Sequence, residues 1–252
     1  MKSYVFPGQG SQFCGMCNDL YQNYPILNEL FKSAEEILGF DISKIMFDGS
    51  KDELIQTKVT QPAIFIHSMA ILKVLGESYK PDQVAGHSLG EFSALVAARV
   101  LSFEEGLNLV SIRAKAMQKA CENSNGTMAA ILALENEIIE HVCSNIEGVV
   151  LAANYNCPGQ VVISGEFQSV KKACEILTEK GARRALILPV SGAFHSSLMS
   201  EAKVKLSKAI GEISFNKPIF SNTPFPFLQL PFLHKIVISS SFQIPSTLVP
   251  SE

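Results

Sequence analysis

The sequence predicts an α/β protein in which a small lobe is inserted into a larger body built on a parallel sheet. In the first half of the chain, short apolar strands lead through glycine-containing turns into helices, an alternation typical of α/β folds. From residue 127 to residue 190 the expected order becomes strand, helix, strand, strand, helix, strand. This order is the ferredoxin-like pattern. A helix expected over 197–210 then returns the chain to the body.

Boundary residues place the elements of the body. Pro25 and Pro62 each suit the first turn of a helix, and Gly39 suits a helix end. Ser102 and Glu105 have capping-box spacing. The expected elements are strands over 3–6 and 83–86, and helices over 25–38, from 62, over 91–98 and from 102.

The elements of the lobe follow from apolar runs and turn residues. Pro158 and Gly159 separate two of its strands, and Gly181 closes its second helix. The expected elements are strands over 128–134, 149–153, 160–164 and 185–190, and helices over 136–145 and 168–180. These boundaries divide the chain into a body of residues 1–126 and 191–222, a lobe of residues 127–190, and a tail of residues 223–252.

The composition is that of a globular protein. Apolar residues make up 47% of the 252 residues and charged residues 18%, and the net charge is −3, which does not favour nucleic acid binding. The N-terminus has no signal-peptide pattern, and no apolar stretch is expected to span a membrane. Six cysteines indicate reduced thiols and a cytoplasmic protein. The spacing of Cys14 and Cys17 is interpreted as packing, so neither a metal nor a cofactor is expected.

A candidate nucleophile lies in the segment Gly86-His87-Ser88-Leu89-Gly90, which matches the pattern G-x-S-x-G. A serine on a sharp turn from a strand into a helix needs small flanking residues, and glycine supplies them. The turn exposes the hydroxyl and places the N–H of Leu89 at a helix N-terminus, where it can stabilise negative charge. The pattern therefore predicts that Ser88 is catalytic.

A serine hydroxyl needs a base at neutral pH. Of the five histidines, His195 lies in a loop between the last strand of the lobe and the following helix, where catalytic groups are often found. His87 adjoins Ser88, but its side chain is expected to point elsewhere. The residues alone favour His195 over His87 and leave both open.

Two further features have a chemical interpretation. Residues 6–12 form a glycine-rich loop that fits neither a dinucleotide fingerprint nor a P-loop. Its exposed N–H groups could supply the second donor of an oxyanion hole. Arg113 lies in a helix of mixed polarity, where it can be exposed or can point inward.

Taken together, these segments resemble the malonyl-CoA:acyl carrier protein transacylase family. The resemblance rests on six segments in family order: 6–12 (PGQGSQ), 60–63 (TQPA), 86–91 (GHSLGE), Arg113, 154–161 and 192–196 (GAFHS). It extends over residues 1–222 and implies an α/β-hydrolase-like body with an inserted ferredoxin-like lobe.

The resemblance also implies a role for each site residue. Ser88 would be the nucleophile and His195 the general base and acid, while the backbone N–H groups of Gln9 and Leu89 form the oxyanion hole. Arg113 would bind the free carboxylate of the malonyl group, because its planar fork makes two parallel hydrogen bonds to a carboxylate. Malonyl-CoA and acyl carrier protein would be the substrates, in fatty acid biosynthesis, with neither membrane nor nucleic acid as a partner.

The sequence departs from the family after Asn222. A C-terminal motif of the family, which supplies a carbonyl that orients the histidine, is not found in residues 223–252. Those residues contain five of the twelve prolines and only two charged residues, and are interpreted as a truncated or frame-shifted, poorly ordered tail. Two alternatives therefore stand beside the transacylase: a serine esterase or thioesterase, and an inactive relative that only binds carrier protein or CoA. Basic residues of the lobe are candidates for carrier-protein docking: Lys171, Lys172, Arg183 and Arg184.

Overall fold

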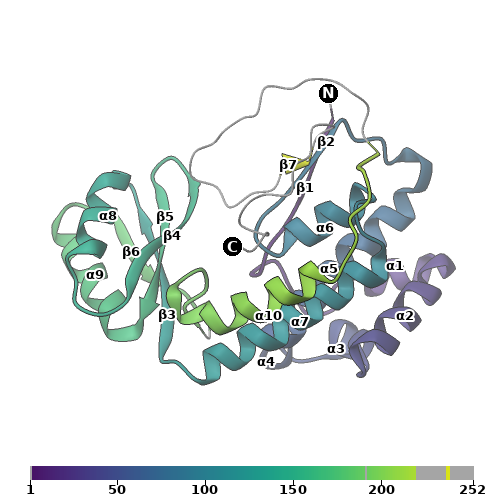
Figure 1. Ribbon diagram of the computed structural model, residues 1–252, viewed down its shortest axis with the longest axis horizontal. Coiled ribbons are helices and arrows are strands. Elements are labelled where there is room, and N and C mark those ends of the chain that lie inside the picture. Colours follow the sequence, from purple (N-terminus) through teal and green to yellow (C-terminus); the bar gives the residue numbers. More distant parts are fainter. Residues whose placement is uncertain (1, 191, 220–236, 239–252) are drawn as a thin grey trace. The chain divides into compact units, whose positions relative to one another are not determined.

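The computed structural model describes residues 2–190, 192–219 and 237–238. They fall into two compact units (Figure 1). The first contains residues 2–115, 205–219 and 237–238, and the second contains residues 116–190 and 192–204. The boundaries between the units fall within helix α7 (Phe103–Glu122) and helix α10 (Ser200–Gly211).

The first unit is built around a small sheet of order β1-β2-β7. Strands β1 (Ser3–Phe6) and β2 (Gln83–Gly86) are parallel, as the sequence predicts, and β7 (Val237–Ile238) pairs antiparallel with β2. The parallel register aligns Phe6 with Gly86. The loops that follow the two strands therefore begin at the same edge of the sheet, which is where the candidate site lies.

Helices surround this sheet and supply most of the core of the first unit. Fully buried side chains of this core include Phe31, Phe65 and Leu95. The helical elements are α1 (Asn18–Asn23), η1 (Pro25–Leu27), α2 (Asn28–Leu38), α3 (Ile42–Asp48), α4 (Lys51–Leu54), α5 (Thr57–Leu75), η2 (Gly76–Ser78), α6 (Gly90–Ala97) and the beginning of α7.

Several predicted helix boundaries are confirmed and one is wrong. Gly39 ends α2 with φ of 77°, and Ser102 and Glu105 form the predicted capping box, with both reciprocal hydrogen bonds present. Pro62 was expected in the first turn of its helix, but α5 begins at Thr57 and Pro62 lies inside it. The helix is therefore longer at its N-terminus than predicted. In this added segment the hydroxyl of Thr60 donates to the carbonyl of Gln56 at 3.1 Å.

The second unit has the predicted order of strands and helices. Its elements are β3 (Gly126–Leu132), α8 (Asn136–Ser144), β4 (Val150–Cys157), β5 (Gln160–Glu166), α9 (Phe167–Glu179) and β6 (Arg184–Ile187), followed by η3 (Ser197–Met199). The sheet has the order β4-β5-β3-β6, and all of its pairs are antiparallel. The β4 pairing is interrupted by register shifts between Ala152 and Asn154 and between Tyr155 and Cys157.

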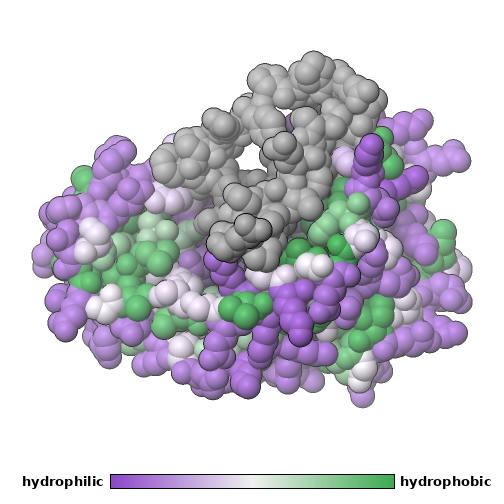
Figure 2. All heavy atoms as spheres, viewed as in Figure 1, coloured by the Kyte–Doolittle hydropathy of each residue, from purple (hydrophilic) through white to green (hydrophobic). Residues whose placement is uncertain are grey.

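Each face of this second sheet has its own apolar cluster. Ile131, Ile163 and Leu177 are fully buried where α8 and α9 pack on the sheet. Met128 and Phe194 belong to a separate cluster with the C-terminal part of α7 and residues of α10. Figure 2 shows hydrophilic side chains over most of the outer edge of each unit on the face in view. The apolar side chains of α8 and α9 that belong to the first of these two clusters pack on the sheet.

Among the described residues, one helical segment, Thr57–Ser78, is long and apolar enough to cross a bilayer by length and composition. Length and composition alone do not make this helix a membrane span, so the expectation from the sequence is not contradicted. Within the fold, 61% of the apolar window is buried, as in the core helix of a soluble domain. The predicted disorder of the tail lies outside the described residues, apart from β7.

Candidate active site

Ser88 lies on the turn between β2 and α6, as the G-x-S-x-G pattern predicts. Its φ is 53°, in the left-handed region that residues with a Cβ rarely occupy. The side chain is half-buried, and the N–H of Glu91 donates to the Ser88 carbonyl at 3.1 Å as the helix begins. Such backbone strain is typical of functional turns and persists only where the surroundings fix it.

The two glycines of the pattern are required by the surrounding backbone. A Cβ on Gly86 would lie 2.0 Å from the carbonyl carbon of Gly90, and a Cβ on Gly90 would lie 2.2 Å from the carbonyl oxygen of Phe6. Both contacts are with backbone atoms, which cannot rotate away as a side chain can. The parallel strands and the turn are packed so closely that only glycine fits at either position.

Arg113 points inward and contacts the serine. Its exposed fraction is 9%, so the exposed alternative left open by the sequence is excluded. The guanidinium Nη2 donates to Ser88 Oγ at 2.8 Å, and its centre lies 6.0 Å from the ring centroid of Phe92. Because Oγ accepts this hydrogen bond, its own proton is available to a different acceptor. The cation is therefore held directly beside the hydroxyl.

A chain of neutral side chains supports the arginine. Gln61 is fully buried in α5, and its Oε1 accepts a hydrogen bond from Arg113 Nη1 at 2.7 Å. Gln61 Nε2 donates at 3.4 Å to the side chain of Gln9, whose own Nε2 donates at 3.5 Å to Thr57 Oγ1. The last two bonds are long and weaker. The glycine-rich loop and the arginine are thus linked through Gln61.

One carboxyl group lies near the arginine. Burial raises the pKa of Glu91 to about 8, against the opposing effect of the Arg113 charge. Burial lowers the pKa of Arg113 to about 10, and the carboxyl of Glu91 opposes that shift. At neutral pH the arginine is therefore charged while Glu91 is largely protonated.

His195 occupies a tight turn in the second unit, whereas Ser88 and Arg113 lie in the first. Its φ of 61° is left-handed, like that of Ser88. The turn is held by Ser196, whose hydroxyl donates to the carbonyl of Ala193 at 2.7 Å and accepts from Leu198 N at 3.2 Å. A Cβ on Gly192 would lie 2.1 Å from Cys121 Sγ, so this turn also needs its glycine.

The remaining site candidates lie at the ends of the two parallel strands. Leu89 directly precedes α6, so its N–H is at the positive end of the helix. Gln9 follows β1 in the glycine-rich loop, where Gly10 has φ of 109° and Ser11 Oγ donates to the Gly8 carbonyl at 2.9 Å. His87, the other candidate base, lies against this loop, because a Cβ on Gly8 would be 2.7 Å from its Nδ1.

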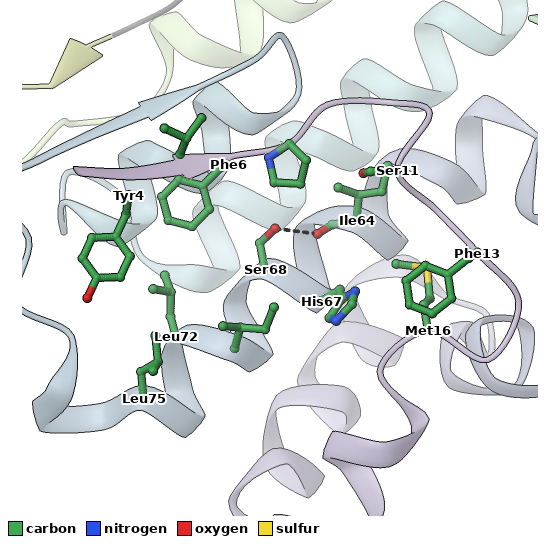
Figure 3. Close-up of a pocket in the computed structure, with 13 residues that line it drawn as sticks. Tyr4, Phe6, Ser11, Phe13, Met16, Ile64, His67, Ser68, Leu72 and Leu75 are labelled. Atoms are coloured by element: carbon green, nitrogen blue, oxygen red, sulfur yellow. Dashed lines mark hydrogen bonds between the residues drawn. The ribbon is translucent and has the colours of Figure 1, made fainter. Parts of the chain in front are cut away.

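A separate cavity of about 240 Å³ lies between β1, the glycine-rich loop and α5 (Figure 3). Its walls are mostly apolar, and they include none of the polar side chains around Ser88. Burial lowers the pKa of His67, whose ring lies 6.0 Å from that of Phe13. The hydroxyl of Ser68 is already bonded to the Ile64 carbonyl at 2.9 Å. This cavity therefore offers packing surface rather than a nucleophile.

None of the six cysteines forms a disulfide in the structure. Burial raises the pKa of the Cys17 thiol to about 12, which disfavours its reactive thiolate form. Among residues 2–190 and 192–219, no group of three or more His, Cys, Asp and Glu side chains could hold a metal ion.

Sequence reasoning missed the roles of Gln61 and Glu91, although both lie in the motifs that carry the resemblance. Gln61 is a polar residue among buried apolar neighbours in α5. Such a residue indicates a buried hydrogen bond, because burying an unpaired amide is costly. The sequence therefore indicates that Gln61 has a buried hydrogen-bond partner. It does not identify that partner, since Arg113 is 52 residues away in sequence.

The fold and the serine turn define the class of protein. Residues 3–223 match the family described as acyl transferase domain. The chain belongs to this family.

Individual relatives are more specific. The chain is 46% identical over 222 residues to the malonyl CoA-acyl carrier protein transacylase of Haemophilus influenzae, covering 86% of this chain and 71% of that protein. It is 44% identical over 227 residues to the Bacillus subtilis protein of the same name, covering 87% of this chain and 72% of that protein.

Solved structures agree with these relatives. A malonyl-transacylase in complex with the acyl-carrier protein of a type II PKS superposes with a TM-score of 0.82 at 41% identity. The acyl-carrier-protein S-malonyltransferase of Burkholderia pseudomallei superposes with a TM-score of 0.80 at 45% identity. Each match covers 86% of this chain and 72% of the other, so the similarity includes most of both units.

Proposed function

We propose that this protein transfers a malonyl group from malonyl-CoA to the phosphopantetheine thiol of acyl carrier protein, as in fatty acid biosynthesis. The single observation that carries the proposal is the hydrogen bond from Arg113 to Ser88 Oγ at 2.8 Å. This bond supports the proposal, because a buried cation beside Ser88 could bind the free carboxylate of a serine-bound malonyl group. An arginine in this position distinguishes malonyl transfer from general ester hydrolysis.

The reaction has two half-reactions. Ser88 Oγ attacks the carbonyl carbon of the malonyl-CoA thioester while His195 takes the hydroxyl proton. The C–S bond then breaks, and His195 returns the proton to the leaving CoA thiol. In the second half-reaction, His195 takes the proton of the carrier thiol, and the sulfur attacks the carbonyl carbon of the malonyl-serine ester. The ester C–O bond then breaks, and His195 returns the proton to Ser88 Oγ.

The oxyanion of each tetrahedral intermediate is assigned to two backbone N–H groups. Leu89 offers one at the start of α6, and Gln9 offers the other from the loop after β1. The parallel pairing of Phe6 with Gly86 supports this assignment, because it begins both segments at one edge of the sheet. Donors fixed by backbone geometry stabilise developing charge without reorganising.

The pairing of Ser88 with His195 is part of the proposal. Both side chains are half-buried, and both residues have left-handed φ angles. Each lies near a glycine at which an added Cβ would clash with neighbouring atoms. The relatives named as malonyl transacylases support a catalytic role for each of the two residues. An α/β-hydrolase-like body and a ferredoxin-like lobe over 127–190 complete the proposed architecture. The antiparallel order β4-β5-β3-β6 supports the lobe.

Carrier protein is proposed to dock on the basic surface of the lobe. Lys171 and Lys172 on α9 and the neighbouring Arg183 and Arg184 are exposed. Carrier proteins are acidic, so charge would steer their association. Six cysteines without a disulfide fit a reducing compartment, and we place the protein in the cytoplasm.

The proposed function is tested by Ser88→Ala. Transfer of labelled malonyl from malonyl-CoA to holo acyl carrier protein should fall by about a thousandfold or more, because no acyl-serine can form. The unaltered chain is the reference. Malonyl transfer that persists in the variant at the unaltered rate rejects Ser88 as the nucleophile. Rapid hydrolysis of malonyl-CoA without transfer would favour the esterase alternative.

A further inference from the structure

The partner that holds Arg113 is an uncharged amide. Gln61 Oε1 accepts from Arg113 Nη1 at 2.7 Å, and the amide side chain is fully buried. Buried arginines are commonly paired with a carboxylate, which would fix the guanidinium equally well but neutralise its charge. The structure uses an amide instead, at a position two hydrogen bonds from the nucleophile.

The guanidinium of Arg113 makes one hydrogen bond to Gln61 and one to Ser88. One nitrogen, Nη1, is engaged by Gln61, and the other terminal nitrogen, Nη2, donates to Ser88 Oγ at 2.8 Å. The first bond fixes the plane and position of the fork, while the second marks the side from which an acyl group on Ser88 would approach. Neither of these two hydrogen-bond partners carries a charge.

The nearby carboxyl group fits the same arrangement. Burial raises the pKa of Glu91 to about 8, which favours its uncharged form, while the charge of Arg113 acts in the opposite direction. Gln9 and Thr57, the next side chains along the hydrogen-bonded chain from Gln61, are also uncharged. The side chains hydrogen-bonded to Arg113, Gln61 and Ser88, and those further along the chain are therefore uncharged.

Building on the proposed function, we infer that Gln61 is a positioning residue that determines acyl selectivity. It orients Arg113 without cancelling its charge, so the cation can bind an acyl group that ends in a free carboxylate. A glutamate at this position would bind Arg113 as an internal carboxylate and would compete with the malonyl carboxylate. Neutral acyl groups such as acetyl would lose nothing by the exchange.

The test compares acyl-enzyme formation on the full chain with malonyl-CoA and acetyl-CoA supplied together at equal concentration. Intact-mass measurement gives the ratio of the two adducts. Gln61→Glu should lower the malonyl-to-acetyl ratio by about tenfold or more, since hydrogen bonds to charged groups have effects of this order. Gln22→Glu, which adds the same charge at an exposed position of α1, should leave the ratio unchanged.

A second variant separates position from charge. Gln61→Met removes the accepting oxygen without adding charge, so the ratio should fall by a smaller factor, about threefold to tenfold. If Gln61→Glu does not fold, this variant alone decides the matter. An unchanged ratio in either folded variant overturns the inference, and a loss in the Met variant as large as in the Glu variant contradicts the charge argument.

Failure of this inference can be told apart from failure of the proposed function. If the unaltered chain forms a malonyl adduct and Gln61→Glu keeps its ratio, only the role of Gln61 is rejected. If the unaltered chain forms no malonyl adduct at all, the proposed function is rejected, and the role of Gln61 falls with it. Arg113→Ala, which removes the clamp itself, gives the lower limit of the ratio.

Discussion

At the scale of single residues, the glycines around Ser88 determine whether the site can form. Gly90→Ala should destabilise the protein by about 2–4 kcal/mol, because the new Cβ would lie 2.2 Å from the Phe6 carbonyl oxygen and would push β1 away from the turn. Urea unfolding measures the change. Gly211→Ala is the control, since a Cβ there meets nothing within 4 Å. Equal stability of the two variants would contradict the close packing of this turn.

A second residue-scale prediction concerns Glu91. Its pKa is about 8 in the folded chain and 4.5 without the fold. Between these pH values the native state holds a proton that the unfolded state has released, so stability falls as pH rises through this window. The upper limit of this contribution is about 1.4 kcal/mol per pH unit, and partial exposure of Glu91 reduces it.

The measurement is the free energy of unfolding as a function of pH for Glu91→Gln and the unaltered chain. The variant should lose less stability than the unaltered chain between pH 5 and pH 8, because its amide has no proton to release. Glu29→Gln, at an exposed position of α2, is the matched control and should follow the unaltered chain. Parallel curves for Glu91→Gln and the unaltered chain would show that Glu91 ionises normally.

At the scale of elements, α7 brings Arg113 to the site, and its start is fixed by the capping box. Ser102→Ala should lower stability by about 1 kcal/mol, because the N–H of Glu105 loses its acceptor at 3.1 Å. Thermal unfolding checks this, and Ser102→Asp, which keeps a side-chain acceptor, should retain most of the stability. A Ser102→Ala variant as stable as the unaltered chain would show that tertiary packing alone determines where α7 begins.

Elements with strong local signals could be predicted from the sequence, and elements with weak signals could not. Strand β2, helix α6 and the order of the second unit follow from turn residues and apolar runs. Short helices such as α3 and α4 were not predicted, although Ser50 and Glu53 form a capping box that the spacing alone indicates. The predicted start of α5 was too late because proline favours the first turn of a helix, and Pro62 was therefore taken as its beginning. In the structure α5 begins at Thr57, and the side chains of Thr57 and Thr60 are buried.

The site residues also differ in how far the local sequence predicts them. Ser88 was predictable because the chemistry of its turn is local, within five consecutive residues. The inward direction of Arg113 and the role of Gln61 were not, since both depend on which faces of α5 and α7 meet. The helical period indicates which side chains share one face of a helix, but it does not identify the residue that each side chain contacts on another helix.

At the scale of the whole molecule, the chain has two units with separate cores, and the proposed catalytic residues are divided between them. Ser88, Arg113, Gln61 and Gln9 lie in the first unit, and His195 lies in the second. The proposed roles give acyl binding to residues of the first unit and proton transfer to a residue of the second, because a serine hydroxyl needs a base for rapid attack.

The most direct measurement of this account is peptide mass mapping after incubation of the chain with malonyl-CoA. The predicted result is a single malonyl adduct on the peptide that contains Ser88. In His195→Ala the adduct should form at least about a hundredfold more slowly. A malonyl adduct on a peptide without Ser88, or equal rates of labelling with and without His195, would contradict the account.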